Sequence, residues 1–193
     1  PDNGIRRYNL HDKKWPDCGG YLEWFQSDFG EFADDSFFDE LYYYDDIHQN
    51  EHKRARLISL RARLRSSVQP SSPGSIVYLK RGASGAVRRL VNEHELIERL
   101  ERAGVKIVCP EERSIDEIMP EILDSSVIIS IEGSQLSHAL YAVHDRGGIL
   151  VIQPPDRMFI SHFDWARMMG VEFGMVVGRH VDGGFSVSFE EIM

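Results

Sequence analysis

From residue 75 onward, short apolar runs alternate with stretches in which apolar residues recur at helical spacing. The runs are rich in Val and Ile, which is typical of parallel strands buried on both faces. We expect strands at 76–79, 105–109, 127–131, 149–152, 173–177 and 185–189, and helices at 93–103, 115–124, 134–145 and 158–169. This alternation predicts an α/β fold, a Rossmann-like, doubly wound parallel sheet that forms the middle of three layers.

Two local signals support the expected helix boundaries. Leu96 and Leu100 fall on one face of the first helix of this domain, and Gly104 stands where a glycine commonly ends a helix. Ser114 precedes Glu117 by three residues, the spacing of a capping box at the start of the next helix.

The residues before this domain form a segment of different character. The first 50 residues are rich in aromatic and acidic side chains, and we expect loops and short strands whose aromatic rings pack onto a neighbour. A helix is expected at 51–67, with solvated arginines, and the Pro, Ser and Gly residues at 69–74 form a linker. We therefore divide the chain into an irregular N-terminal segment, 1–68, and a Rossmann-like domain, 75–193.

Charge is segregated along the chain. The 193 residues have a formal net charge of −9, but residues 53–104 carry 12 Lys and Arg against four Asp and Glu. The acidic total and the lack of aromatic residues among the basic ones argue against a nucleic-acid partner. The basic block instead indicates either a solvated helix face or an anionic small-molecule partner.

Composition also limits the location and the cofactors of the protein. No apolar run approaches the roughly 18 residues of a membrane-spanning helix, and no secretory signal precedes the domain, so we expect a cytoplasmic protein. The first residue is not Met, and we expect a piece of a longer chain. Cys18 and Cys109 provide neither a disulfide framework nor a zinc site. We expect no metal and no cofactor.

In a doubly wound sheet, ligands bind beyond the carboxyl ends of the strands. Arg81 leaves the first strand there, and Arg88 and Arg89 follow a glycine-containing loop. Guanidinium groups suit a phosphate or diphosphate because they offer a permanently charged fork of donors. Since adjacent side chains point to opposite sides, only one of Arg88 and Arg89 is expected to face the ligand.

The next two strand ends add acids and a histidine. Glu111 follows the second strand, where it either accepts hydrogen bonds from a ligand or serves as an acid near a helix start. Glu132 leaves a buried strand, so we expect an arginine partner or a protonated carboxyl, for ligand chemistry or as a structural ion pair. Gly133 and Ser134 would bring helical N–H groups to an anion. His138 either faces the ligand or is a core histidine.

These residues resemble the core of family 61 glycosyltransferases, which include protein O-linked GlcNAc transferases, plant xylan-decorating enzymes and bacterial capsular-polysaccharide proteins. The resemblance rests on 78–81, 88–96, 104–111 and 132–138. It covers about residues 75–178 and more weakly 38–67. The family motif His-Gly-Ala-x-Leu-Thr-Asn corresponds to 132–138, with Glu132 in place of His, Ser134 in place of Ala and His138 in place of Asn.

The resemblance implies the carboxyl-terminal, donor-binding half of a GT-B-type enzyme and an inverting, metal-independent transfer from a UDP-sugar. It makes the N-terminal segment a remnant of the acceptor domain. Glu132 and His138 are the two residues near the expected cleft that could act as the catalytic base. The residues expected to bind the donor are Arg81, Arg89, Asn92, Glu111, Gly133, Ser134 and Gln135.

The leading hypothesis is therefore a glycosyltransferase of polysaccharide biosynthesis that acts on a saccharide or protein hydroxyl. Two alternatives remain open. One is a non-catalytic module of the same fold that binds nucleotide sugars or assembles as a homodimer. The other is an enzyme similar to polysaccharide pyruvyl transferases, which would use phosphoenolpyruvate.

Overall fold

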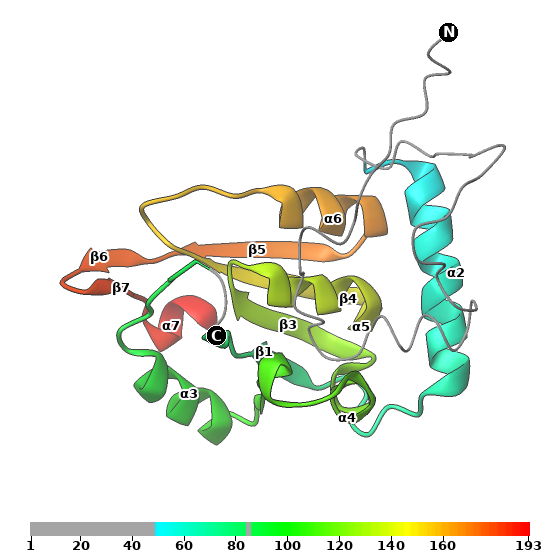
Figure 1. Ribbon diagram of the computed structural model, residues 1–193, viewed down its shortest axis with the longest axis horizontal. Coiled ribbons are helices and arrows are strands. Elements are labelled where there is room, and N and C mark those ends of the chain that lie inside the picture. The colour runs from blue at the N-terminus through cyan, green and yellow to red at the C-terminus, as the bar shows by residue number, and fades with distance from the viewer. Residues whose placement is uncertain (1–48, 84–85) are drawn as a thin grey trace, which may run out of the picture. The chain divides into compact units, whose positions relative to one another are not determined.

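Five parallel strands form the central sheet in the computed structural model, in the order β2-β1-β3-β4-β5 (Figure 1). The structure describes residues 49–83 and 86–193; the loops and short strands expected in the first 48 residues lie outside them. The strands are β1 (Ile76–Leu79), β2 (Lys106–Val108), β3 (Ser125–Ile131), β4 (Val143–Gln153) and β5 (Glu172–Val177). The helices are α2 (Glu51–Ser67), α3 (Glu93–Arg102), α4 (Ile115–Ile122), α5 (Ala139–Ala142), α6 (Ser161–Met169) and α7 (Phe189–Ile192).

The strand order identifies where the chain changes direction across the sheet. From β1 the chain runs outward through α3 to β2, and it then returns through α4 to β3 on the other side of β1. Tyr78 of β1 therefore pairs with Ile107 of β2 and with Ile129 of β3. The carboxyl ends of β1 and β3 lie side by side at this switch point, which is where open α/β sheets bind their ligands.

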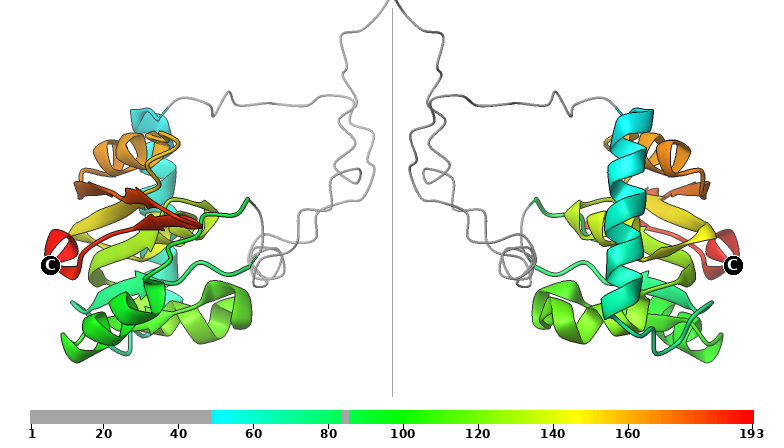
Figure 2. Two further views of the ribbon diagram at one scale, coloured as in Figure 1. Left: turned by 90° about the vertical axis from the view of Figure 1, so that its left-hand side faces the viewer. Right: turned by 90° about the vertical axis from the view of Figure 1, so that its right-hand side faces the viewer.

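The two faces of the sheet carry different helices (Figure 2). Tyr78, Ile129 and Ile152 point to the face covered by α3 and α7 and pack with Leu96 and Leu100 in one buried cluster. Alternate strand residues point to the opposite face, where right-handed crossovers place α4, α5 and α6. The three-layer α/β architecture expected from the sequence is confirmed.

Helix α2 lies at the amino ends of the strands, at the other end of the sheet from the switch point (Figure 1). Arg61, only 1% exposed, donates to the carbonyl oxygens of Leu140 and Val143 and forms an ion pair with Asp145 at 2.8 Å. Arg65 forms ion pairs with Asp124 at 2.8 Å and with Asp145 at 3.1 Å. The expectation that the arginines of this helix are solvated is therefore wrong for these two residues, because their guanidinium groups bond carbonyl and carboxylate groups near the starts of β3 and β4.

Most expected elements are present, and two expectations need correction. The capping box of Ser114 and Glu117 is formed, and Gly104 has the left-handed φ of +83° expected after α3. The helix expected at 134–145 is instead a 3-10 helix (Ser134–His138) and the single turn of α5, after which β4 begins at Val143. The strand expected at 185–189 is shorter: β6 (Arg179–Val181) and β7 (Gly184–Ser186) form an antiparallel hairpin, and α7 begins at Phe189.

Candidate functional site

The candidate site lies at the switch point between β1 and β3. Arg81 is the second residue after β1, and Glu132 and Gly133 directly follow β3. Three arginines from two crossover loops meet there: Arg81 and Arg88 before α3, and Arg157 between β4 and α6. The sheet thus places a cluster of cations where the fold rule expects a ligand.

Glu132 is the acid at the centre of these arginines. Its side chain is 3% exposed, and its Oε2 lies 2.6 Å from Nε of Arg88 and 3.3 Å from Nε of Arg157. Nη2 of Arg88 also donates to Oε1 at 3.4 Å. Because a buried carboxylate without a partner is costly, these two arginines account for its presence in the interior. The arginine partner expected for Glu132 is present.

A hydrogen-bond network holds Arg81 beside Gly133. Nη1 of Arg81 donates to Oε1 of Gln135 at 3.2 Å, and Nη2 donates to the carbonyl oxygen of Ala86 at 2.8 Å. Gln135 in turn donates to Oγ of Ser130 at 2.9 Å and to a β3 carbonyl at 2.6 Å. A Cβ on Gly133 would overlap both Arg81 and Gln135. Glycine is needed here for close approach of side chains, and Gln135 fixes the orientation of the guanidinium.

Burial and the neighbouring Arg88 lower the pKa of the Arg81 guanidinium. A second cation so close to a partly buried one raises the electrostatic potential at this point, which favours an anionic ligand.

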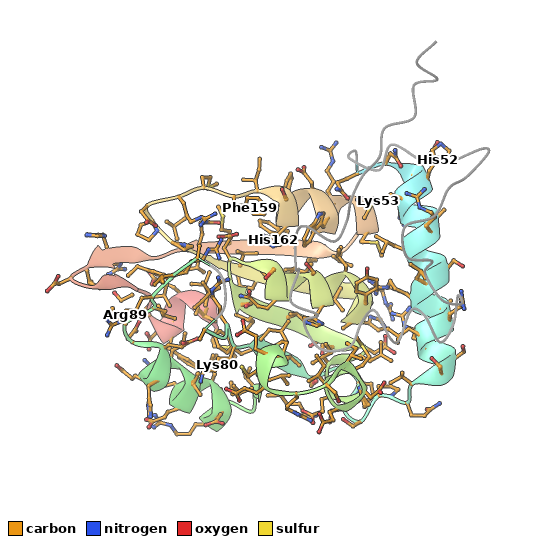
Figure 3. All side chains as sticks on the ribbon, viewed as in Figure 1. His52, Lys53, Lys80, Arg89, Phe159 and His162 are labelled. Carbon is orange, nitrogen blue, oxygen red and sulfur yellow. The ribbon has the colours of Figure 1, made fainter. Side chains whose placement is uncertain are left out.

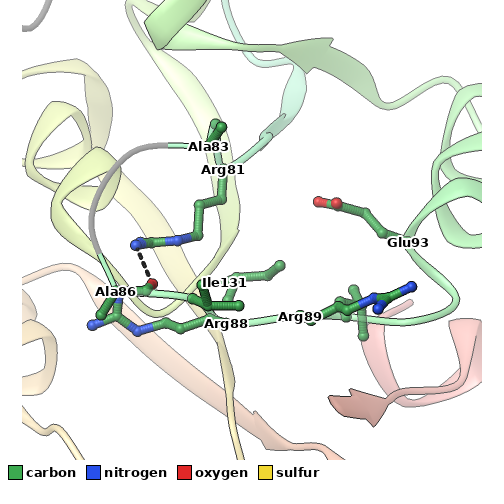
Figure 4. A pocket seen from close by; sticks show the side chains of 10 residues that line it. Arg81, Ala83, Ala86, Arg88, Arg89, Glu93 and Ile131 are labelled. Atoms are coloured by element: carbon green, nitrogen blue, oxygen red, sulfur yellow. Dashed lines mark hydrogen bonds between the residues drawn. The ribbon is translucent and has the colours of Figure 1, made fainter. Parts of the chain in front are cut away.

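A pocket of about 260 Å³ opens beside Arg81 and Arg88 (Figure 4). The guanidinium groups of Arg81 and Arg88 lie on the side of Ala86, whereas Arg89 extends to the other side, toward Glu93. Glu93 accepts a hydrogen bond from the buried Tyr78 hydroxyl at 2.8 Å. The residues lining the pocket are Arg81, Gly82, Ala83, Ala86, Val87, Arg88, Arg89, Leu90, Glu93 and Ile131.

The segment that carries Arg88 and Arg89 is held by the C-terminal hairpin. The Phe185 N–H donates to the Arg89 carbonyl oxygen at 3.0 Å, and the Val91 N–H donates to the Phe185 carbonyl oxygen at 2.9 Å. The Asn92 side chain donates to the carbonyl oxygen of Val187 at 2.8 Å. Asn92, expected at the donor, is thus engaged with Val187, and these contacts set which way each arginine points.

The remaining expected site residues lie at different depths. Glu111 is part of a 3-10 turn (Pro110–Glu112), and its carboxylate lies against Gly82, so that a Cβ there would overlap it. Ser134 is exposed at the start of the short 3-10 helix. His138 is buried at the end of that helix, and desolvation lowers its pKa to about 4.

Two residues near the site have no signal in the sequence pattern. Arg157 follows β4, and His162 stands at the start of α6, where Phe159 contacts it edge-on with ring centroids 5.3 Å apart (Figure 3). His162 is 2% exposed, and burial lowers its pKa, whereas the charge of Glu132 and a hydrogen bond with the Gly133 backbone act in the opposite direction. Only the buried acid at Glu132 could have indicated that further cations were needed.

The described residues show neither a metal-binding cluster nor a membrane-spanning helix. Within residues 49–83 and 86–193, no group of three or more His, Cys, Asp and Glu side chains could hold a metal ion. None of the helices described is long and apolar enough to span a membrane.

Comparison with known protein families gives a match. The sequence profile of the Glycosyltransferase 61 family matches residues 10–149, which include most of the N-terminal segment and the sheet up to the middle of β4. No curated protein has a significant sequence match to the chain.

Proposed function

Because the chain belongs to the Glycosyltransferase 61 family, we propose that it transfers a sugar from a nucleotide-diphosphate sugar to a hydroxyl group of a saccharide or protein. The donor diphosphate binds at the switch point, in the pocket beside Arg81. A UDP-sugar and a role in polysaccharide biosynthesis belong to this proposal, as does a GT-B-type arrangement with the acceptor bound by a second domain.

The observation that carries the proposal is the convergence of Arg81, Arg88 and Arg157 around Glu132 at the carboxyl ends of β1 and β3, where Arg81 and Arg88 also line a pocket of about 260 Å³. Diphosphates need positive charge and several donors, which guanidinium groups supply. Sugar transfer breaks the bond between the anomeric carbon and the diphosphate oxygen, and the same cations stabilise the charge that develops on the leaving group.

An inverting transfer also needs a base for the acceptor proton. As the acceptor oxygen bonds to the anomeric carbon, its proton passes to the base and the bonding electrons of the old link leave with the diphosphate. His138 is neutral near pH 7, because its pKa is lowered to about 4, but it is buried. Glu132 is engaged by Arg88 and Arg157. Either residue must become accessible to the acceptor hydroxyl before it can take up its proton.

The proposal is tested by donor binding. UDP-glucose, UDP-N-acetylglucosamine and UDP-xylose are added separately while thermal unfolding is followed, and at least one is expected to raise the melting temperature. Arg81→Ala should abolish the shift, whereas Arg102→Ala, an exposed arginine on α3, should keep it. The proposal fails if no nucleotide sugar in a broad panel changes the melting temperature of the unaltered protein.

The enclosure of both possible bases favours a second candidate, a module of the same family that binds a nucleotide sugar without turning it over. Hydrolysis or transfer of a radiolabelled UDP-sugar distinguishes the two. Release of UDP by the isolated chain, lost in Arg81→Ala, would exclude a purely binding role. Phosphoenolpyruvate as the donor in the same assay tests the pyruvyl-transferase alternative.

A further inference from the structure

We infer that Glu132 is a built-in counter-anion of the diphosphate site. It weakens the binding of an anion more strongly the more negative charge the anion carries. It therefore favours release of the free nucleoside diphosphate after sugar transfer. This inference rests on the proposed function for the identity of the ligands. The juxtaposition that supports it, one carboxylate among three arginines, is part of the structure.

The geometry of Glu132 differs from that of an ordinary surface ion pair. Arg88 and Arg157 come from two different crossover loops, yet the Nε atoms of both lie within 3.3 Å of one carboxylate oxygen. The carboxylate is 3% exposed and Arg88 is 10% exposed, so that water screens the pair little. Glu132 thus keeps the two arginines together when no ligand is bound.

An anion that enters the site must share these arginines with Glu132. Gly133, the next residue, packs against the Arg81 guanidinium, and the charge of Glu132 acts on Arg81 as well. The three arginines and Glu132 sum to a formal charge of +2, which would be +3 without the carboxylate. The repulsion between Glu132 and a bound ligand increases with every negative charge that the ligand carries.

Donor and product differ in that respect. A nucleotide-diphosphate sugar has two ionised phosphates, whereas the free nucleoside diphosphate gains roughly one more negative charge, because a terminal phosphate has a second ionisation near pH 6. Glu132 therefore repels the product more than the donor. Since product release limits many enzymes, a carboxylate at this position acts on the step after sugar transfer.

The test is calorimetric binding of UDP, UDP-N-acetylglucosamine and inorganic pyrophosphate to the unaltered chain and to Glu132→Gln. The amide keeps an acceptor for Arg88 but has no charge. We expect UDP and pyrophosphate to bind about 10-fold tighter, which corresponds to about 1.4 kcal/mol, and the nucleotide sugar to gain less. Glu190→Gln, which removes the same charge from the ion pair with Arg99 on α3, should leave all three affinities unchanged.

Weaker or unchanged binding of UDP to Glu132→Gln would overturn the inference, because it would make Glu132 a support for Arg88 and nothing more. Arg157→Gln, at a position that is 39% exposed, gives a second test that leaves Glu132 and Arg88 in place. It should weaken UDP binding more than nucleotide-sugar binding, and equal losses would contradict the inference. If the unaltered chain binds pyrophosphate but no nucleotide, the proposed function fails while the pyrophosphate measurement still decides the role of Glu132.

Discussion

Replacement of the buried Arg61 by methionine tests whether α2 is an integral part of the folded domain. In the structure, the Arg61 guanidinium donates to the carbonyl oxygens of Leu140 and Val143 and pairs with Asp145. Methionine fills much of the volume of the arginine stem but provides no donor. The carbonyl groups of Leu140 in α5 and of Val143 at the start of β4 would therefore lose this partner.

The magnitude follows from those two carbonyl groups. A buried acceptor left without a donor costs about 1–3 kcal/mol, so two cost roughly 2–6 kcal/mol. Part of this is offset because the guanidinium no longer has to be desolvated, a cost visible in the pKa of Arg61, which burial lowers. We expect Arg61→Met to reduce the free energy of unfolding by about 2–4 kcal/mol.

Urea unfolding, followed by circular dichroism and by tryptophan fluorescence, measures this change. Arg63→Met, on the exposed face of the same helix, is the matched control and should change the free energy of unfolding by less than about 0.5 kcal/mol. The argument is refuted if Arg61→Met is as stable as the unaltered protein, because the apolar side chain would then replace the buried charge without loss.

Three further predictions concern His138, Gly133 and Asn92. Since burial lowers the pKa of His138 from 6.5 to about 4, the unfolded chain binds the proton more readily, and stability falls as pH decreases from 6.5 toward 4, by up to about 3 kcal/mol. Urea midpoints at several pH values should show this slope, and a slope unchanged in His138→Gln would contradict it. Gly133→Ala should displace Arg81 and weaken UDP-sugar binding about 10-fold, or 1.4 kcal/mol, as measured by calorimetry; unaltered affinity would place the diphosphate elsewhere. Asn92→Ala removes the link to Val187 and should lower the free energy of unfolding by about 1–2 kcal/mol in urea; a neutral effect would show that water replaces the amide.

The sheet could be predicted from the sequence because its strands are short runs of Val, Ile and Leu, and because the capping box at Ser114 and the glycine at 104 mark helix ends locally. The error at 134–145 has a non-local cause. Arg61, about 80 residues earlier in the chain, donates to the carbonyl oxygens of Leu140 and Val143, so the chain leaves the helix where a local pattern would continue it. No apolar run marks the strand β6, because two of its three residues are Arg179 and His180.

The site could also be predicted in part, because strand ends can be located from the sequence. Arg81, Glu132 and Gly133 directly follow strands, and the end of a strand is visible in the pattern. Whether Arg88 or Arg89 faces Glu132 was not decidable, because that depends on the pairing of this segment with Phe185. Contacts of this kind join residues almost a hundred positions apart and leave no periodic trace in the sequence.

The hairpin formed by β6 and β7 also has a consequence for the order in which the molecule is made. Arg88 and Arg89 are synthesised almost a hundred residues before Phe185, which holds the backbone of their segment. The strands of the sheet can pair earlier, whereas the arginine segment acquires its register only after Phe185 has left the ribosome. A nascent chain that stops short of Phe185 would therefore have the sheet without an ordered anion site, so that ligand binding reports on synthesis past the hairpin.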